Sequence, residues 1–343
     1  MCQEQSSWDE PSLKPCVPPG RWLAAPPKEQ ELEQVILAQG ITTLEEYRTA
    51  GRIGRSGVLS RSKRDAVWPV FGEYRGQLAS RKLKEVDDAY REVATMLHAA
   101  QVKGGDYSAV VVDETQDFGQ QALKLLRALI PPAPNDLFFV GDGHQRIYSR
   151  HRAAMSKCGI DIRGRSRKLY LNYRTTDKIR RQAVALLEGC EVDDLDDGHD
   201  ETKRYKSLSR GPAPVIVQAE GLEAAAAQAI GFVKALRADA ADGHAPTICV
   251  IASSEKTREA MAKQLLAAGL AGVTITAQSN HGDARDKVHF ATMHRAKGLE
   301  FDAVVVVAPQ GYFGNIEQTA NQRKLMYVAL TRAKRAAMLI RVG

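Results

Sequence analysis

The sequence has few of the features that mark secreted, membrane-spanning or zinc-binding proteins. Its five cysteines are scattered and odd in number, with no Cys-x-x-Cys pair, and its eight histidines show no His-Glu-x-x-His spacing. These absences argue against a disulfide framework and against a zinc site. The longest apolar run, residues 303–309, is too short to cross a bilayer, and no apolar leader with basic flanks opens the chain. We therefore expect a cytoplasmic protein with reduced thiols and no membrane segment.

The residues that are present describe a globular chain with a basic bias. The 343 residues are 44% hydrophobic and 26% charged, which suits two domains with buried cores. The net charge is +7, and the basic residues are clustered. Residues 146–181 hold twelve Lys/Arg against two acids, and residues 52–64 hold five against none. Such runs can be solvated faces or phosphate contacts, so their interpretation depends on the motifs around them.

The first hundred residues change character near residue 60. The first sixty are rich in proline, glycine and arginine, which argues against an ordered domain, although residues 29–38 and 43–50 could form short helices. Residues 66–100 have a helical pattern, with apolar positions spaced by three and four. The residues that carry this pattern are Trp68, Phe71, Tyr74 and Leu78.

Beyond residue 100, short apolar runs alternate with amphipathic stretches. The predicted strands are 109–112, 137–140, 168–171, 215–217, 248–251, 273–275, 288–291, 303–307 and 337–342. The predicted helices are 120–129, 177–187, 222–238, 256–268 and 322–333. Continuous apolar strands between helices are typical of a parallel sheet that is covered on both faces. The fold class is therefore α/β.

Five polar motifs lie near the ends of these strands, and parallel α/β sheets bind ligands beyond the carboxyl ends of their strands. The motifs are DETQD (113–117), GDGHQRIY (141–148), LNYRTT (171–176), ATMHRAKGLEF (291–301) and KLMYVALTRA (324–333). A carboxylate such as Asp113 can hold Mg²⁺, and Glu114 can orient or deprotonate water. Arg174 offers a planar fork that matches phosphate oxygens. Taken singly, each motif is also compatible with a surface turn or a solvated helix end.

In their order and wording, the five motifs resemble motifs II to VI of the UvrD/Rep family of superfamily 1 DNA helicases. The resemblance covers the chain from Trp68 to the C-terminus. It implies an ATP-dependent helicase or translocase that moves 3′ to 5′ on single-stranded DNA. ATP and Mg²⁺ would bind in a cleft between two RecA-like domains. The implied partners are single-stranded DNA or DNA junctions.

The resemblance assigns a chemical role to each matching residue. Asp113 would coordinate Mg²⁺, and Glu114 would be the general base for the attacking water. Gln145 would read the γ-phosphate. Arg174 and Arg332 would be arginine fingers that stabilise charge on the transferring phosphoryl group.

The remaining assignments concern the base, the ribose and the DNA. Tyr173 would stack on adenine, and Glu300 would contact the ribose or the phosphate-coupled network. Arg150 stands where the family usually has a tryptophan, and a guanidinium can also stack on a base. The residues expected to face single-stranded DNA are Tyr148, Arg150, Thr292 and His294.

One family feature has no counterpart in the sequence, namely the phosphate-binding loop Gly-x-x-x-x-Gly-Lys-Ser/Thr before motif II. Residues 51–57 contain glycines but no Gly-Lys-Ser/Thr, and residues 103–105 lie directly before the motif II strand. The resemblance therefore predicts an N-terminally truncated member whose first RecA-like domain is incomplete. A sheet edge left open in that domain would favour aggregation.

We accordingly expect three parts. Residues 1–60 would be irregular, residues 61–166 would be a remnant of the first RecA-like domain with its preceding helices, and residues 167–343 would be a more complete second RecA-like domain. An acidic loop is expected at residues 188–212, because seven of the eleven residues 191–201 are Asp or Glu.

Two functions remain open. The first is an ATP-dependent DNA helicase or translocase. The second is a non-catalytic nucleic-acid-binding remnant or regulatory module, since a chain without the phosphate-binding lysine would lose most of its phosphate affinity. A protein partner that supplies the missing loop is a third idea. ATP hydrolysis in the presence of single-stranded DNA separates the first two.

Overall fold

The computed structural model describes residues 31–51, 59–99, 107–147, 153–190, 192, 204–239, 245–276, 286–313 and 316–343. The chain divides into two compact units. The first unit contains the residues up to 112 together with residues 118–138 and 150–160. The second contains residues 113–117, 139–149 and 161–343.

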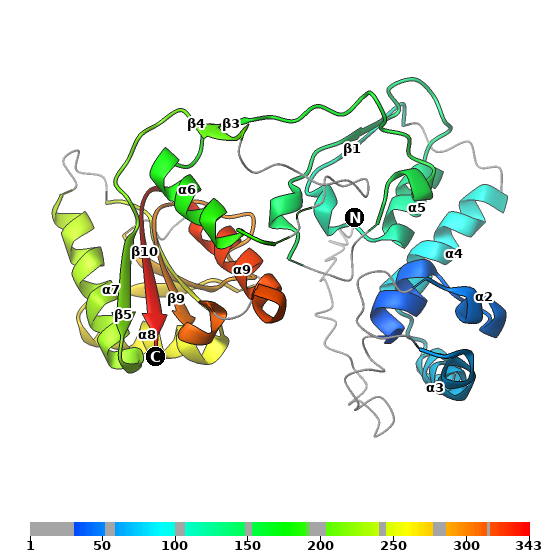
Figure 1. Cartoon of the computed structure of the whole chain (residues 1–343), viewed down its shortest axis with the longest axis horizontal. Coiled ribbons are helices and arrows are strands. Elements are labelled where there is room, and N and C mark those ends of the chain that lie inside the picture. Colours follow the sequence, from blue (N-terminus) through cyan, green and yellow to red (C-terminus); the bar gives the residue numbers. More distant parts are fainter. Residues whose placement is uncertain are drawn as a thin grey trace, which may run out of the picture. The chain divides into compact units, whose positions relative to one another are not determined.

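A six-stranded sheet forms the frame of the second unit (Figure 1). Its strands are β5 (Val215–Ala219), β6 (Ile248–Ala252), β7 (Gly272–Thr274), β8 (Val288–Thr292), β9 (Phe301–Pro309) and β10 (Ala333–Val342). The strand order is β5-β10-β9-β6-β8-β7, and every neighbouring pair is parallel. The predicted α/β class with a parallel sheet is therefore confirmed.

Helices cover both faces of this sheet. Helices α6 (Asp177–Leu186) and α9 (Ile316–Leu330) pack on one face, whereas α7 (Gly221–Ala238) and α8 (Glu255–Ala267) pack on the other (Figure 1). Strand β6 is fully buried, and its residues alternate between the two cores. Cys249 and Ile251 face α6 and α9, while Ile248 and Val250 face α7 and α8. Apolar side chains on both faces explain why this strand is a continuous hydrophobic run.

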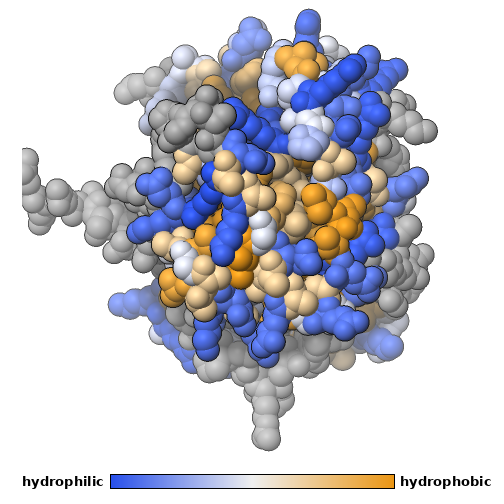
Figure 2. All heavy atoms as spheres, turned by 90° about the vertical axis from the view of Figure 1, so that its left-hand side faces the viewer, coloured by the Kyte–Doolittle hydropathy of each residue, from blue (hydrophilic) through white to orange (hydrophobic). Residues whose placement is uncertain are grey.

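Strand β5 forms one edge of the sheet. Val215 and Ile216 on this strand are 43% and 40% exposed. Figure 2 views the molecule from the side on which α7 and β5 lie in Figure 1, and it shows hydrophobic residues gathered between hydrophilic ones. Among the described residues, no helix combines the length and the apolarity needed to traverse a bilayer.

The first unit is mainly helical in its described part. Its helices are η1 (Leu32–Leu37), α2 (Leu44–Thr49), α3 (Arg61–Ser80), α4 (Val86–Ala99), α5 (Gln120–Ala128) and η5 (Ser156–Cys158). Strands β1 (Val110–Val112) and β2 (Leu137–Phe139) form a two-stranded sheet. Helices η1 and α2 lie within the ranges 29–38 and 43–50 where short helices were expected, and the helical pattern that begins at residue 66 divides into α3 and α4.

The aromatic pattern of α3 is buried against the residues that precede it. Tyr47 is fully buried, with its ring stacked on Trp68 at 5.6 Å and meeting Phe71 edge-on at 6.0 Å. The Tyr47 hydroxyl donates a hydrogen bond to the Glu31 carboxylate at 3.0 Å. The Arg64 guanidinium lies 5.6 Å above the same ring. Residues 31–50 thus form part of a core and not a loose extension.

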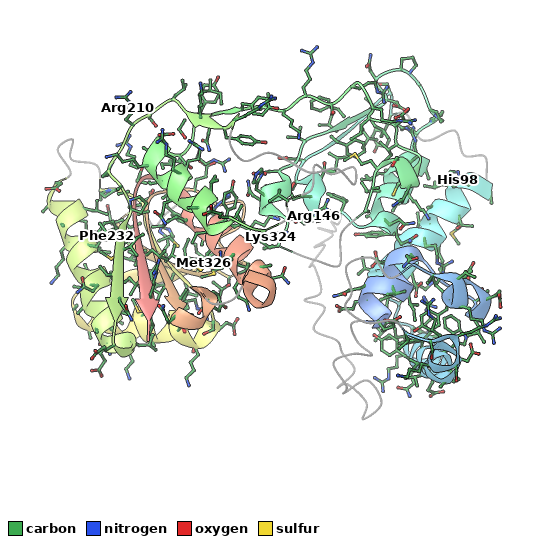
Figure 3. The ribbon with its side chains drawn as sticks, viewed as in Figure 1. His98, Arg146, Arg210, Phe232, Lys324 and Met326 are labelled. Carbon is green, nitrogen blue, oxygen red and sulfur yellow. The ribbon has the colours of Figure 1, made fainter. Side chains whose placement is uncertain are left out.

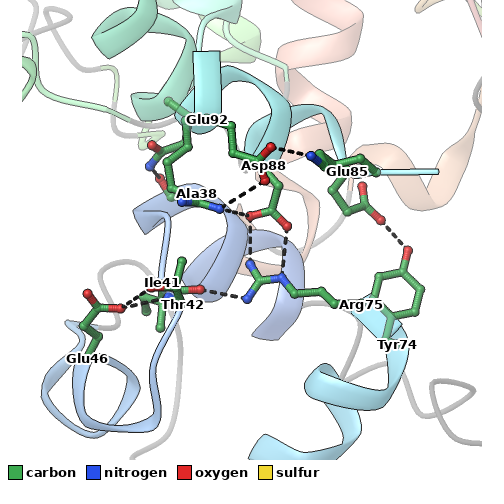
Figure 4. Close-up of polar contacts among 12 residues, drawn as sticks. Ala38, Ile41, Thr42, Glu46, Tyr74, Arg75, Glu85, Asp88 and Glu92 are labelled. Atoms are coloured by element: carbon green, nitrogen blue, oxygen red, sulfur yellow. Dashed lines mark hydrogen bonds and ion pairs between the residues drawn. The ribbon is translucent and has the colours of Figure 1, made fainter. Parts of the chain in front are cut away.

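A buried ion pair ties α3 to α4 (Figure 4). Arg75 Nε and Nη2 contact the two carboxylate oxygens of Asp88 at 3.0 and 2.9 Å, and Arg75 Nη1 donates to the Ile41 carbonyl at 2.9 Å. The Asp88 side chain is only 8% exposed. A two-point contact of this kind fixes the geometry of both helices.

Two predicted elements are displaced. The strand expected at residues 168–171 is wrong: β3 is Leu171–Asn172, paired with β4 (Lys206–Ser207), and Leu169 is 84% exposed. The final strand begins at Ala333 and not at residue 337, and α9 ends at Leu330. The alanine-rich start of β10 favours helix by propensity, but its pairing with Phe301 on β9 holds it extended.

Replacement of Arg75 by alanine tests the α3–α4 ion pair. We expect the free energy of unfolding to fall by about 2 kcal/mol, because the buried Asp88 would lose its two-point partner and keep only Arg91, whose Nη2 lies 3.6 Å from Asp88 Oδ1. Chemical denaturation followed by circular dichroism measures this change. Arg81→Ala, at an exposed arginine that ends the same helix, should change the free energy by less than about 0.5 kcal/mol. Equal effects of the two substitutions would contradict the assignment.

Exposed apolar side chains on the two-stranded sheet predict self-association. Val111 on β1 is 72% exposed and Phe138 on β2 is 62% exposed. Exposed apolar side chains on a small sheet tend to associate with other chains. We expect the wild-type chain to elute above its monomer mass of 37.6 kDa on a sizing column, increasingly so with concentration. The Val111→Thr/Phe138→Thr variant should elute as a monomer, and identical elution of both proteins at every concentration would refute the prediction.

Candidate functional site

The residues of this site that the structure describes all belong to the second unit. The turn after β1 presents two carboxylates, Asp113 and Glu114. Glu114 has a φ of 52°, in the left-handed region that non-glycine residues seldom adopt. Its N–H donates to Asp113 Oδ1 at 2.7 Å, and the Gln116 side-chain amide donates to its carboxylate. These contacts hold the strained turn and fix the direction of the Glu114 side chain.

The same turn is bonded to the segment that follows β2. Thr115 donates from both its N–H and its hydroxyl to the Val140 carbonyl, at 3.0 and 2.8 Å. The Asp142 N–H donates to Gln116 Oε1 at 2.9 Å. Because Thr115 and Gln116 are buried, these bonds are shielded from water. The turn and the 139–145 segment therefore act as one polar frame.

Asp142 organises the short helix η3 (Gly143–Gln145) within that frame. Its carboxylate accepts from the His144 N–H at 2.9 Å and from Gln145 Nε2 at 2.8 Å. Burial alone would raise the pKa of Asp142, but the His144 hydrogen bonds and the contact with Gln145 hold it below the ordinary value. The contact with Asp142 fixes the amide nitrogen of Gln145, so the amide oxygen is left to accept a hydrogen bond from another group.

That oxygen meets a buried arginine. Arg332 is 1% exposed, and its Nη2 donates to Gln145 Oε1 at 2.8 Å. Its Nε donates to the Val328 carbonyl at 3.1 Å. Burial and the like charge of Arg174 lower the pKa of Arg332, while the charge of Glu114 opposes this shift. A guanidinium remains protonated in proteins, so Arg332 is a positive charge stored inside the site.

A lysine joins the first and fourth motifs. Lys297 Nζ lies 2.5 and 2.6 Å from the two carboxylate oxygens of Asp117 and 3.1 Å from the Gln145 carbonyl oxygen. The Lys297 side chain is 9% exposed. Both residues stand inside motifs that the sequence analysis identified, but neither was assigned a role. Both stand among polar and partly exposed neighbours, so no local pattern in the sequence distinguished them.

Arg174 and Glu300 form a second ion pair, which is more exposed. Arg174 Nε lies 2.6 Å from Glu300 Oε1, and Lys334 Nζ lies 3.2 Å from Glu300 Oε2. The Asn172 side chain accepts from the Arg174 N–H at 2.8 Å and so shapes the turn after β3. Tyr173, in the same turn, is 73% exposed.

These residues do not all lie at the carboxyl ends of strands, as the sequence suggested. Thr292 ends β8, but Glu300 precedes β9 and Arg332 precedes β10. In a parallel sheet the amino ends of strands lie at the opposite edge from the carboxyl ends. Arg174 joins the amino-end group through its ion pair with Glu300. The expectation of a single carboxyl-end site is therefore corrected for Glu300 and Arg332, whereas Arg174 follows β3 as expected.

The residues expected to face DNA are only partly described. Thr292 Oγ1 accepts from the Arg295 N–H at 3.4 Å, and His294 is exposed. Partial burial and the neighbouring charge of Arg295 lower the pKa of His294, which favours a neutral ring at pH 7. Tyr148 and Arg150 lie outside the described residues.

The donor set fits Mg²⁺ held together with a phosphate, and it does not fit a metal cage. Within the described part of the chain, no three His, Cys, Asp or Glu residues gather as a metal site. Mg²⁺ in phosphoryl-transfer sites is typically held by one or two carboxylates, waters and substrate phosphates. Asp113 is an exposed carboxylate and could serve as such a ligand.

Comparisons with known proteins agree with the motifs. Residues 28–158 match a family model described as the UvrD/REP helicase N-terminal domain, and residues 270–342 match the UvrD-like helicase C-terminal domain. The first match begins well before Trp68, and the two together cover more than half of the chain. The chain is also similar to the C-terminal domain of a possible DNA helicase from Lactobacillus plantarum WCFS1. That match has 25% identity and a TM-score of 0.37, and covers 50% of this chain and 88% of that one. No curated protein matches the chain.

The Lys297–Asp117 pair predicts a difference between two lysines of the same unit. Lys297→Met should lower the free energy of unfolding by about 2 kcal/mol, because it leaves the Asp117 carboxylate without its buried cation. Lys334→Met removes an ammonium group whose side chain is 42% exposed, and should cost less than about 0.5 kcal/mol. Chemical denaturation of both variants gives the comparison, and a larger loss from Lys334→Met would overturn this interpretation.

Asp142 predicts a pH dependence of stability. A carboxyl whose folded-state pKa is lowered stabilises the fold above its ordinary value of 3.8, and this contribution is lost as the pH falls through the lowered value. Wild type should therefore be more stable than Asp142→Asn at pH 5 to 7, and the difference should shrink as the pH falls below 3.8. Thermal unfolding at a series of pH values measures the difference. A difference that does not change with pH would be inconsistent with this role.

Proposed function

Because the chain belongs to the UvrD/Rep helicase family, we propose that it functions in an ATP-dependent DNA helicase or translocase, with hydrolysis coupled to movement on single-stranded DNA. The observation that carries this proposal is the buried contact between Arg332 and Gln145. A guanidinium held inside the fold, in contact with the glutamine assigned to the γ-phosphate, is suited to stabilise a transferring phosphoryl group.

The chain's own residues would divide the chemistry of hydrolysis among them. Asp113 would hold Mg²⁺ jointly with nucleotide phosphates, and the Mg²⁺–ATP complex would supply the phosphoryl group and neutralise its charge. Glu114 would accept the proton of the attacking water. Gln145 would orient that water or contact the γ-phosphate. Arg332 would release the Gln145 oxygen and direct its fork toward phosphate oxygens.

Arg174, Tyr173 and Glu300 would bind the remainder of the nucleotide. Arg174 is a second guanidinium, less buried than Arg332, and it could exchange its Glu300 contact for phosphate. Tyr173 is exposed and offers a free aromatic face for the adenine ring. Glu300 could then accept hydrogen bonds from the ribose hydroxyls.

Single-stranded DNA would be bound by Thr292 and His294, with Tyr148 and Arg150 as further contacts. The hydroxyl and the neutral imidazole can donate to phosphate oxygens without adding charge. An aromatic ring and a guanidinium can stack on bases without regard to sequence.

The second candidate is a non-catalytic module that binds nucleic acid. It is favoured by one observation, namely that the printed sequence contains no Gly-x-x-x-x-Gly-Lys-Ser/Thr run. In that case the residues described above would still form the frame of the fold. Another polypeptide that supplies the phosphate-binding loop would restore hydrolysis.

ATP hydrolysis with and without single-stranded DNA tests the proposal. We expect DNA-stimulated turnover, reduced at least about 100-fold by Glu114→Gln, which keeps the size of the side chain but cannot accept the proton. Arg332→Lys keeps the charge, loses the fork, and should reduce turnover by a similar factor. Glu223→Gln, at an exposed position on α7, is the matched control and should behave as wild type. DNA binding without turnover above Glu114→Gln would instead support the non-catalytic module.

A further inference from the structure

A basic groove on the second unit is used by neither the hydrolysis chemistry nor the DNA contacts proposed above. It encloses about 640 Å³ between α6 and the segment that contains β4. Figure 3 shows Arg210 on that segment, beyond β4. The charged residues that line the groove are Asp177, Arg180, Arg181, Lys206 and Arg210.

The groove carries an excess of positive charge. Its one carboxylate, Asp177, is shared between two arginines, with Arg180 Nη2 at 2.7 Å and Arg181 Nε at 2.6 Å. Lys206 and Arg210 are both exposed, and within the described residues neither forms an ion pair. Among the described residues that line the groove, four cationic side chains therefore accompany one acid, which is already occupied. Such an arrangement attracts a polyanion.

Aromatic and apolar side chains lie among these charges. Tyr205 lines the groove, with its ring 5.4 Å from that of Tyr170. The Arg204 guanidinium lies 5.9 Å from the Tyr170 ring. Leu208, also in the lining, is 62% exposed. A surface that bound phosphate alone would need only positive charge. The exposed bases of a single strand also bind apolar and aromatic surface.

We infer that this groove binds single-stranded DNA through its phosphate backbone, in addition to the contacts of Thr292 and His294. The inference rests on the proposed function for the identity of the polyanion. Lys206 and Arg210 contact phosphates, and Tyr205 and Leu208 lie against the unpaired bases. The groove accounts for part of the basic run at residues 146–181, since Arg180 and Arg181 end that run.

Charge reversal at the two exposed cations tests the groove. The double variant Lys206→Glu/Arg210→Glu is compared with Lys256→Glu/Lys263→Glu, which makes the same change in net charge on exposed positions of α8. The probe is a fluorescently labelled twenty-residue oligo(dT), and its anisotropy is measured at several salt concentrations. Circular dichroism of all three proteins establishes that each is folded.

We expect the groove variant to bind the oligonucleotide about tenfold more weakly than wild type, and the α8 variant to bind as wild type does. The slope of log affinity against log salt should become shallower by about 1.4 in the groove variant, since each lost phosphate contact removes about 0.7 for a single strand. A duplex of the same length should bind wild type more weakly than the single strand.

Several results would overturn the inference. The groove variant could bind as wild type, both variants could weaken equally, or wild type could fail to bind the oligonucleotide. Equal affinity for the duplex would overturn the assignment to single strands. Failure of the proposed function has a different signature, namely groove-dependent binding without any ATP hydrolysis. If the groove variant kept both DNA-stimulated hydrolysis and the DNA affinity of wild type, the groove assignment alone would be wrong and the proposed function would stand.

Discussion

Burial of both faces of the parallel sheet is the constraint on which the second unit depends. Strands β6 and β9 have almost no polar side chains because helices cover them from both sides. Polar groups are therefore confined to the strand ends and the turns beside them. Thr292, Glu300 and Arg332 all stand at such ends, so the packing of the sheet decides where chemistry can occur.

The charges that enter the interior are each matched by a specific partner. Arg332 is almost completely buried and is held by Gln145 and by backbone carbonyls, while Lys297 is held by Asp117. Unpaired charges at these depths would destabilise the fold, so the two contacts serve stability first. Under the proposed function, a phosphate that competes for Arg332 would also free Gln145. The proposed chemical roles would then depend on the same atoms as the structural ones.

The groove beside α6 follows a different principle. Three of its cations, Arg181, Lys206 and Arg210, are exposed, and Asp177 balances only part of the positive charge of the groove. Surface charge of this kind adds little to stability but strongly affects association with polyanions. The second unit therefore combines buried charges that fix geometry with exposed charges that remain available to a partner.

The sequence by itself determined the family, the α/β class and most of the strands, because the signals for them are local. The residues of a motif are read directly along the chain, and a strand buried on both faces must be a continuous apolar run. The start of β10 and the position of β3 could not be read in this way, since pairing with another strand overrode local propensity. Only the tertiary structure decided that Lys297 meets Asp117 and that Arg332 meets Gln145, because these partners are 180 and 187 residues apart. Contacts at such separations depend on the order of strands in the sheet, which no local pattern encodes.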